Sequence, residues 1–193
     1  MAGKKERLRE DYEKSAEFYD SRYKDIQFEK YSIMLSKIAL TQENPAGFSA
    51  PRKLPKQFSW EEPILDLGCG TGLLQEFIPD KKIFGCDFSE KMLERAKERG
   101  EVTKVADLNK KLPYEDDSFA TILSFTVLQN VENVDNFLKE VKRCLKMSGI
   151  FVLTTLKKTT NEKQLIKLIE KYFAIQELTD CGEDVGFVLN PKL

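Results

Sequence analysis

Apolar positions follow a helical period in the first part of the chain. Five residues fall on one face of a helix over residues 5–40, at steps of four, three, four and three: Tyr12, Ala16, Tyr19, Tyr23 and Ile26. This spacing predicts an amphipathic helix. Two roles are compatible with it: the helix can pack on the body of the protein, and its tyrosines can form a lid over a bound ligand.

The pattern breaks between residues 41 and 63. Pro45, Pro51, Pro55 and Pro63 lie in this segment together with Gly47. Proline lacks an amide hydrogen and does not continue a helix. We therefore expect a connecting loop over 41–63.

Strand-like and helix-like runs alternate from residue 64 onward. We expect strands over 64–67, 82–86, 102–106, 119–127 and 150–156, with helices over 73–78, 90–99, 134–145 and 161–172. Gly149 is expected to end the third of these helices. Two final runs, 174–178 and 185–189, are expected to pair as a hairpin. The alternation predicts an α/β fold, a doubly wound parallel sheet covered on both faces, with the hairpin adding an antiparallel edge strand.

Composition excludes several kinds of chemistry. The 193 residues include no histidine, so Ser-His-Asp and Cys-His catalysis and His-ligated metal sites are excluded. Any general base has to be Asp, Glu, Lys, Tyr or Cys. The four cysteines are scattered without a CxxC pair. We interpret them as reduced, mostly buried thiols of a cytoplasmic protein, and we expect no metal.

The charge balance argues against several partners. Lys and Arg number 31 against 32 Asp and Glu, for a net charge of −1. A protein that holds nucleic acid unaided usually carries a basic excess, so we expect no strong autonomous nucleic-acid binding. No apolar run approaches the ~20 residues that cross a bilayer, and the charged start does not resemble a signal peptide. We expect no membrane association.

A glycine-rich turn follows the first expected strand. Gly68, Gly70 and Gly72 occupy alternate positions after Asp66. In a doubly wound sheet this turn lies at the ligand-binding edge. The dinucleotide fingerprint requires a glycine where Leu73 stands, which argues against an NAD-dependent oxidoreductase. The segment also lacks the Lys-Ser/Thr pair of a phosphate-binding P-loop.

Two further carboxylates end the next two strands. Asp87 at the end of the second strand can accept hydrogen bonds from both hydroxyls of a ribose. Asp107 at the end of the third can accept from an adenine amine, while the amide of Leu108 donates to the ring. No phosphate-neutralising cation accompanies them. The expected ligand contains adenosine without a pyrophosphate.

These segments resemble the class I S-adenosylmethionine-dependent methyltransferases. The resemblance lies in 64–72, 85–93, 112–119 and 145–151, and covers most of residues 64–156 in the family's order. It implies a seven-stranded sheet of order 3-2-1-4-5-7-6 with strand 7 antiparallel. Together with the elements predicted above, it gives three regions of a single domain: an N-terminal helical lid over 1–40, a Pro-rich connecting loop over 41–63, and the S-adenosylmethionine-binding methyltransferase part over 64–193.

The resemblance further implies which residues hold S-adenosyl-L-methionine. Carried over by motif position, they are Tyr19, Asp66, Gly68, Cys69, Gly70, Gly72, Asp87, Phe88, Met92, Asp107, Leu108, Ser124, Phe125 and Gln129. Phe88 or Met92 would pack on the adenine, and Ser124 and Phe125 would flank the sulfonium. Some related methyltransferases work with a small zinc-binding activator protein, which the resemblance makes a candidate partner.

The methyl acceptor stays open at this point. Candidate catalytic residues near the mouth of the site are Tyr19, Tyr23, Gln129 and Asn130. Residues 124–130 lack the Asn/Asp-Pro-Pro-Tyr/Phe signature of amide or adenine N-methylation, and no Pro-Cys pair for cytosine C5 methylation is present there. A small molecule, a protein side chain and an RNA base all remain as acceptors. The alternative function is a non-catalytic S-adenosylmethionine sensor or partner subunit of the same fold.

Overall fold

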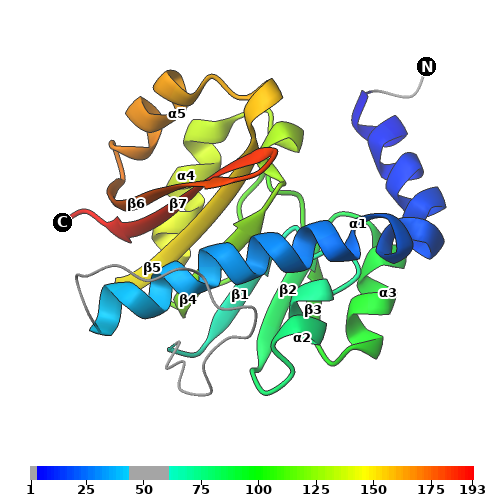
Figure 1. Ribbon diagram of the computed structural model, residues 1–193. Helices are drawn as coiled ribbons and strands as arrows, with labels where there is room; N and C mark the ends of the chain where they lie inside the picture. Colours follow the sequence, from blue (N-terminus) through cyan, green and yellow to red (C-terminus); the bar gives the residue numbers. More distant parts are fainter. Residues whose placement is uncertain (1–3, 44–60) are drawn as a thin grey trace.

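The computed structural model describes residues 4–43 and 61–193. A single seven-stranded sheet forms the centre of the molecule (Figure 1). Its strands are β1 (Ile64–Leu67), β2 (Ile83–Asp87), β3 (Val102–Val105), β4 (Phe119–Phe125), β5 (Leu145–Leu156), β6 (Phe173–Cys181) and β7 (Asp184–Pro191). The helices are α1 (Lys4–Glu43), α2 (Leu73–Phe77), α3 (Glu90–Glu98), α4 (Val134–Cys144) and α5 (Glu162–Ile169), with short 3-10 turns η1 (Leu128–Asn130) and η2 (Lys157–Thr159).

The strand order is β3-β2-β1-β4-β5-β7-β6. The first five strands of this order are parallel, whereas β7 runs antiparallel to both β5 and β6. Both the order and the antiparallel strand confirm the fold predicted from the sequence. The carboxyl ends of β1, β2, β3 and β4 consequently meet along one edge, where doubly wound proteins bind ligands.

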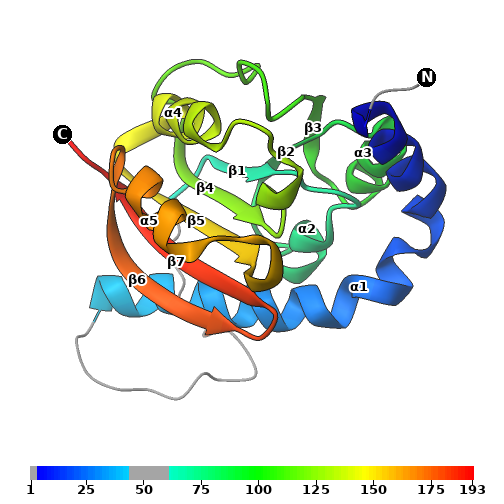
Figure 2. The ribbon, with the colours of Figure 1, turned by 90° about the horizontal axis from the view of Figure 1, so that it is seen from above.

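Helices cover both faces of the sheet, as a parallel sheet requires. Figures 1 and 2 show α1 on one face and α4 on the opposite one. The α1 face is packed by Tyr31, Met34, Leu35 and Ile38, which are at most 5% exposed, together with side chains of α2. Side chains of α4 and α5 pack the other face. Side-chain oxygens of Ser89, Asn133 and Asn161 cap α3, α4 and α5.

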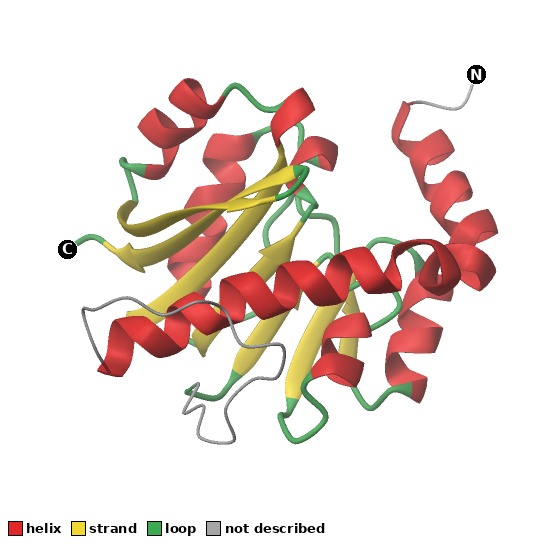
Figure 3. Cartoon of the chain, viewed as in Figure 1, coloured by secondary structure: helices red, strands yellow, loops and turns green. Residues whose placement is uncertain are grey.

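The N-terminal helix is continuous over its 40 residues and bends within its N-terminal half (Figures 1 and 3). No proline or glycine lies at the bend. The hydroxyls of Ser15 and Ser21 donate to the carbonyls of Tyr12 and Phe18, a contact that bends helices. Helix over 5–40 is therefore confirmed. Of the loop expected over 41–63, α1 occupies the first three residues, and 44–60 lie outside the described residues.

Gly149 does not end a helix, contrary to the expectation from its position. The helix α4 ends at Cys144, and Gly149 lies within β5. A Cβ there would stand 2.8 Å from the carbonyl oxygen of Ala120 and 2.6 Å from Leu145 Cδ1. The register between β4 and β5 shifts at this place, between Phe119 and Thr121. The glycine therefore allows β4 and β5 to approach closely where the sheet is irregular.

Candidate active site

The glycine turn connects β1 to α2 and exposes its backbone to a cavity. A Cβ on Gly68 would lie 2.5 Å from Val127 Cγ2, so a side chain at this position would clash. Gly70 has φ +55°, and the nearest atom a Cβ would meet is a ring carbon of Tyr19 at 4.0 Å. The space in front of Gly70 is open. A ligand can thus approach the backbone here in a way that a side chain would prevent.

Asp87 ends β2 directly behind this turn. Its Oδ2 accepts from the amide of Gly70 at 3.2 Å, and its Oδ1 accepts from the amide of Ser89 at 2.9 Å. Burial raises the pKa of the carboxyl above its ordinary value, and these backbone hydrogen bonds partly oppose the rise. Each oxygen keeps a further lone pair for a ligand. Asp87 therefore links the glycine turn to a pair of acceptor atoms at the cavity.

The first cavity lies between the glycine turn, the ends of the parallel strands and α1. Its volume is about 690 Å³, including the part open to solvent. Ten residues singled out from the sequence line it: Tyr19, Gly68, Gly70, Asp87, Phe88, Met92, Asp107, Leu108, Phe125 and Asn130. Residues from both ends of a 112-residue stretch of sequence thus meet at one site.

Six other candidates do not line this cavity. Asp66 is buried within β1, and Ser124 is fully buried with its hydroxyl donating to the carbonyl of Leu67 at 3.4 Å. Cys69 is buried. Gly72 begins α2 against Ala96 of α3.

The remaining two candidates, Tyr23 and Gln129, line a second cavity that adjoins the first. The amide of Gln129 donates to the carbonyl of Thr126 at 2.6 Å.

Five lining residues were not among the predicted site residues: Tyr12, Asn109, Thr126, Val127 and Val131. Tyr12 lies on the same predicted helical face as Tyr19, so its position on α1 was the available signal. Its ring packs edge-on against Phe88 with centroids 5.6 Å apart, and its hydroxyl accepts from Asn130 Nδ2 at 3.1 Å. Burial raises the pKa of both Tyr12 and Tyr19 above the ordinary value. Both phenols are therefore neutral hydrogen-bonding groups at physiological pH.

A group of buried acids lies beneath the glycine turn. Burial raises the pKa of Glu101 to about 7, and burial together with the charge of Glu101 raises that of Asp66. A hydrogen bond from Cys69 and the charge of Arg99 partly oppose the rise in the pKa of Glu101. A Cβ on Gly85 would collide with this carboxylate and with the sulfur of Cys69. The acids therefore pack tightly under the site.

The charge of the first cavity is negative. Among the described residues that line it, Asp87 and Asp107 are acidic and none is basic. A phosphate group would meet no cation there, whereas a positively charged adenosine derivative would meet two carboxylates. This arrangement fits S-adenosylmethionine, whose sulfonium is cationic and which carries no phosphate.

Arg99 holds α1 over the glycine turn. Its guanidinium donates to Asp20 Oδ2 at 2.5 Å and to the carbonyl of Thr71 at 2.7 Å, and it reaches Glu76 at 3.2 Å. The hydroxyl of Thr71 also donates to Asp20, at 2.6 Å. One side chain at the end of α3 thereby joins α1, the turn and α2.

Comparisons with known proteins agree with this geometry. Residues 65–153 match the family described as "Methyltransferase domain". A demethylmenaquinone methyltransferase of Lactobacillus johnsonii is 37% identical over 124 residues, which make up 58% of this chain and 50% of that protein. The chain spans 19% to 51% of the length of the first three curated relatives.

Solved structures share the fold over nearly the whole chain. One is an S-adenosylmethionine-dependent methyltransferase from Thermotoga maritima, described as a possible histamine N-methyltransferase (TM-score 0.67, 21% identity, 94% of this chain and 98% of that one). Another is the methyltransferase in complex with the Haloferax volcanii Trm112 methyltransferase activator (TM-score 0.65, 18% identity, 94% and 98%). Residues 65–153 therefore carry a methyltransferase domain, within a sheet whose strand order is the one that the resemblance to class I S-adenosylmethionine-dependent methyltransferases implied.

Proposed function

We propose that this chain binds S-adenosylmethionine in the first cavity and transfers its methyl group to an acceptor. The observation that carries the proposal is the cavity itself: an open glycine backbone at Gly70, carboxylates at two strand ends, and no basic residue among the described residues that line it. The described residues contain no cluster of His, Cys, Asp and Glu that could hold a metal ion. They also contain no helix long and apolar enough to cross a membrane.

Different lining residues would contact different parts of the cofactor. Asp87 would accept from the ribose hydroxyls, because it ends β2 with free lone pairs beside the glycine turn. Asp107 and Leu108 would contact the edge of the adenine, with Phe88 and Met92 against its faces. Tyr19 of α1 would cover the opening in front of Gly70.

Methyl transfer then depends mainly on placement. When bound, S-adenosylmethionine would supply an electrophilic methyl group: a lone pair of the acceptor would form the new bond to carbon, the carbon–sulfur pair would go to sulfur as the neutral thioether, and the acceptor's proton would pass to bulk solvent. The chain would contribute by holding the acceptor in line with the methyl group. Asn130 and Tyr12, hydrogen-bonded to each other, are two of the polar groups at the cavity wall.

Titration with three ligands tests the proposal. We expect S-adenosylmethionine and S-adenosylhomocysteine to raise the melting temperature in proportion to their saturation, and NAD to leave it unchanged. Incubation with labelled S-adenosylmethionine and a cell extract, fractionated into RNA, protein and small molecules, then locates the acceptor. Stabilisation by NAD alone would overturn the proposal. Binding without methyl transfer to any fraction would favour a sensor of the same fold.

We also propose an activator protein as partner, on two grounds. A structural neighbour forms a complex with the Trm112 methyltransferase activator. The edge strand β3 also carries Val102 and Val105, which are 43% and 55% exposed, and an edge strand presents unpaired backbone groups to a partner.

Co-expression with a Trm112-type activator, followed by size-exclusion chromatography, tests the partner. Val105→Lys should weaken the complex. Leu178→Lys on the opposite edge strand β6, where Leu178 is 46% exposed, should leave the complex intact. Absence of any complex, or equal effects of the two substitutions, would exclude this partner surface.

We propose a cytoplasmic location because of the cysteines. All four are free and buried. Unpaired thiols are typical of a reducing compartment.

A further inference from the structure

A second cavity adjoins the first on the side of α1, β5 and the β6–β7 turn. It shares Tyr12, Tyr19 and Thr126 with the first cavity. Its volume is about 1560 Å³, including the part open to solvent. A molecule in this cavity would therefore lie next to a ligand in the first one, with Thr126 at the boundary between them.

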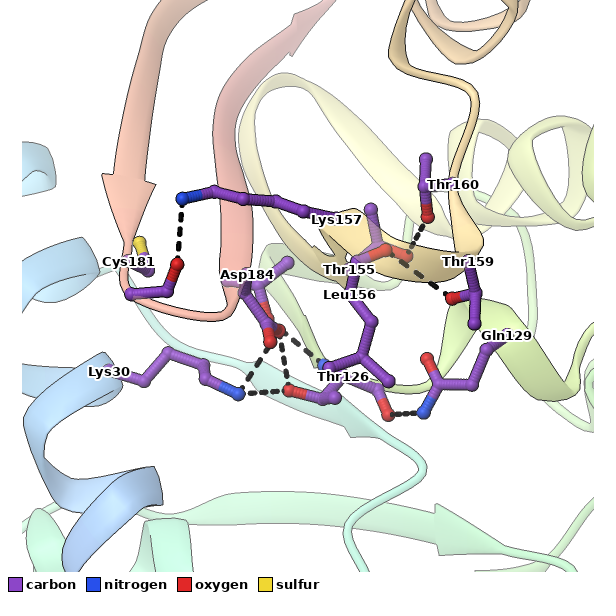
Figure 4. Close-up of polar contacts among 12 residues, drawn as sticks. Lys30, Thr126, Gln129, Thr155, Leu156, Lys157, Thr159, Thr160, Cys181 and Asp184 are labelled. Atoms are coloured by element: carbon purple, nitrogen blue, oxygen red, sulfur yellow. Dashed lines mark hydrogen bonds and ion pairs between the residues drawn. The ribbon is translucent and has the colours of Figure 1, made fainter.

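Thr126 has an unusual backbone that its neighbours hold in place. It follows β4 with φ +55°, a conformation that β-branched residues avoid. Its amide donates to the carbonyl and the hydroxyl of Thr154, at 3.1 and 3.0 Å, and its carbonyl accepts from Gln129. Its hydroxyl donates to Asp184 Oδ2 at 2.7 Å and accepts from Lys30 (Figure 4). Strain maintained in this way is characteristic of functional sites.

Lys30 and Asp184 form a buried ion pair at the wall of the second cavity. The ammonium of Lys30 on α1 lies 3.0 Å from Asp184 Oδ2 at the start of β7, and their side chains are 5% and 1% exposed. Figure 4 shows both groups converging on Thr126. Such a pair contributes little net stability because both charges are desolvated. It does fix the position of the Asp184 carboxylate.

Two buried acceptor atoms belonging to residues of this wall have no donor. Asp184 Oδ1 and Gln27 Oε1 are inaccessible to solvent and lack a hydrogen-bond partner among the described residues. Both residues line the second cavity. An unsatisfied buried acceptor costs about 1–3 kcal/mol. A ligand with hydrogen-bond donors would relieve that cost.

The mouth of the same cavity is apolar. Phe18 and Ile26, both on α1, are 69% and 52% exposed and line it together with Tyr23. Exposed large apolar side chains that gather at a cavity indicate a ligand with an apolar body. The charged side chains of the lining balance: Asp11, Glu183 and Asp184 against Arg22, Lys30 and Lys158. A polyanion such as RNA finds no basic excess there.

We propose that the second cavity binds the methyl acceptor, and that this acceptor is a small molecule with an apolar body and an amine or hydroxyl group. The inference rests on the proposed function, because it places the acceptor beside the cofactor. The donor group of the acceptor is directed to the wall at Asp184 and Gln27, and it reaches their unsatisfied oxygens once the side chains that cover these atoms shift. Thr126, Lys30 and Asp184 are positioning residues at the boundary.

Four matched probes test the chemistry of this cavity by isothermal titration calorimetry, each with S-adenosylhomocysteine present. Tyramine carries both donor groups, phenethylamine the amine only, 4-ethylphenol the hydroxyl only, and 3-phenylpropionate a carboxylate. We expect the three donor probes to bind and 3-phenylpropionate to bind at least about tenfold more weakly, the equivalent of one hydrogen bond to a charged group. The comparison of the two single-donor probes distinguishes an amine acceptor from a hydroxyl acceptor.

Gln27→Met provides the sharper test. It preserves the shape of the side chain and removes the unsatisfied oxygen, so we expect an unchanged or higher melting temperature together with about fivefold to tenfold weaker binding of the donor probes. Phe18→Ala and Ile26→Ala, both at exposed positions, should weaken all four probes. Leu178→Ala, an exposed apolar position that lines neither cavity, is the control and should change nothing.

The outcomes separate the two proposals. If S-adenosylhomocysteine binds but no donor probe does, the acceptor cavity is wrong while the proposed function stands. Equal binding of 3-phenylpropionate, or unchanged probe affinity in Gln27→Met, also overturns the acceptor cavity. If S-adenosylhomocysteine itself fails to bind, the proposed function is wrong.

Discussion

Among the side chains of the first cavity, Asp87 offers two carboxylate oxygens as hydrogen-bond acceptors for the cofactor. In Asp87→Ala, we expect the affinity for S-adenosylhomocysteine to fall by ~1.5–3 kcal/mol, the range for hydrogen bonds to a charged group. Isothermal titration calorimetry measures the loss. Binding should also weaken as pH falls toward the pKa of this carboxyl, which burial raises above 3.8, because the protonated form loses an acceptor.

Asp80→Ala, an exposed acid outside both cavities, is the control for this measurement and should bind normally. Equal affinity in Asp87→Ala and the parent chain would remove Asp87 from the ribose site.

Glu101 makes stability depend on pH. Its pKa is raised by burial from 4.5 to about 7, so between these values the folded protein binds more protons than the unfolded chain. Stability is then fully present below about pH 4.5, falls as pH rises to about 7, and is constant above it. At ~1.4 kcal/mol per pKa unit, the loss should be about 3 kcal/mol.

Urea unfolding at pH 5 and pH 8 measures this loss, and Glu101→Gln, which keeps the shape without the charge, should remove most of it. Asp66 and Asp87 titrate in the same direction, so the difference between the parent and Glu101→Gln is the relevant quantity. An identical pH dependence in both would contradict the assignment.

Sequence reasoning at this scale found the residues whose position follows from a strand end. The glycine turn, Asp87 and Asp107 each end a strand, and parallel strands bring such ends together. The second cavity could not be predicted from the sequence, because Lys30 and Asp184 are far apart in the chain and meet only when α1 lies on the sheet. The positive φ of Thr126 could not be predicted from the sequence either, since threonine rarely adopts that conformation.

At the scale of elements, α1 and β7 interlock through a glycine. A Cβ on Gly186 would collide with the sulfur of Met34 and lie 2.9 Å from its methyl carbon, and Met34 is fully buried. We expect Gly186→Ala to cost about 1–3 kcal/mol by overpacking and Met34→Ala about 2–5 kcal/mol by leaving a cavity. The double variant should lose less than the sum, because the new methyl occupies the vacated space.

Urea denaturation of the four proteins in this cycle measures the coupling. Leu35→Ala combined with Gly186→Ala is the matched control: Leu35 is equally buried on α1 but is not among the nearest neighbours of a Cβ at 186, so its effect should be additive. Additive effects in the Met34 pair would show that α1 and β7 do not meet there.

Element boundaries show where local patterns succeed. Helices α3, α4 and α5 begin at side-chain caps that are visible in the sequence. The prediction that Gly149 ends a helix was wrong. A glycine after a helical run is a common helix end, whereas here it allows close contact between β5 and β4. The apolar residues of α1 that fill the core, Tyr31 to Ile38, lie C-terminal to the apolar face from which the helix was predicted.

At the scale of the whole molecule, the C-terminal half of α1 packs in the core, and its N-terminal half lines the two cavities. We expect a chain lacking residues 1–10 to fold and bind S-adenosylhomocysteine normally. A chain lacking 1–20 should fold but bind more weakly, because Tyr12, Tyr19 and the Asp20 contact to Arg99 are lost. A chain lacking 1–43 should not fold, because the apolar face beneath Met34 and Leu35 becomes exposed.

Near-ultraviolet circular dichroism and calorimetric titration of the three truncations check this series. Cooperative unfolding of the chain that lacks 1–43 would show that α1 is dispensable to the core. Full affinity in the chain that lacks 1–20 would show that the tyrosines do not cover the cofactor.

The continuity of α1 has a consequence for timing. A tethered flap can swing open while the rest of a protein stays still, but the wall formed by Tyr12 and Tyr19 belongs to an unbroken helix anchored in the sheet. We expect a molecule that leaves past that wall to wait until the outer turns unwind. Its residence time should therefore shorten on warming in step with the exchange of amide hydrogens along residues 12–20.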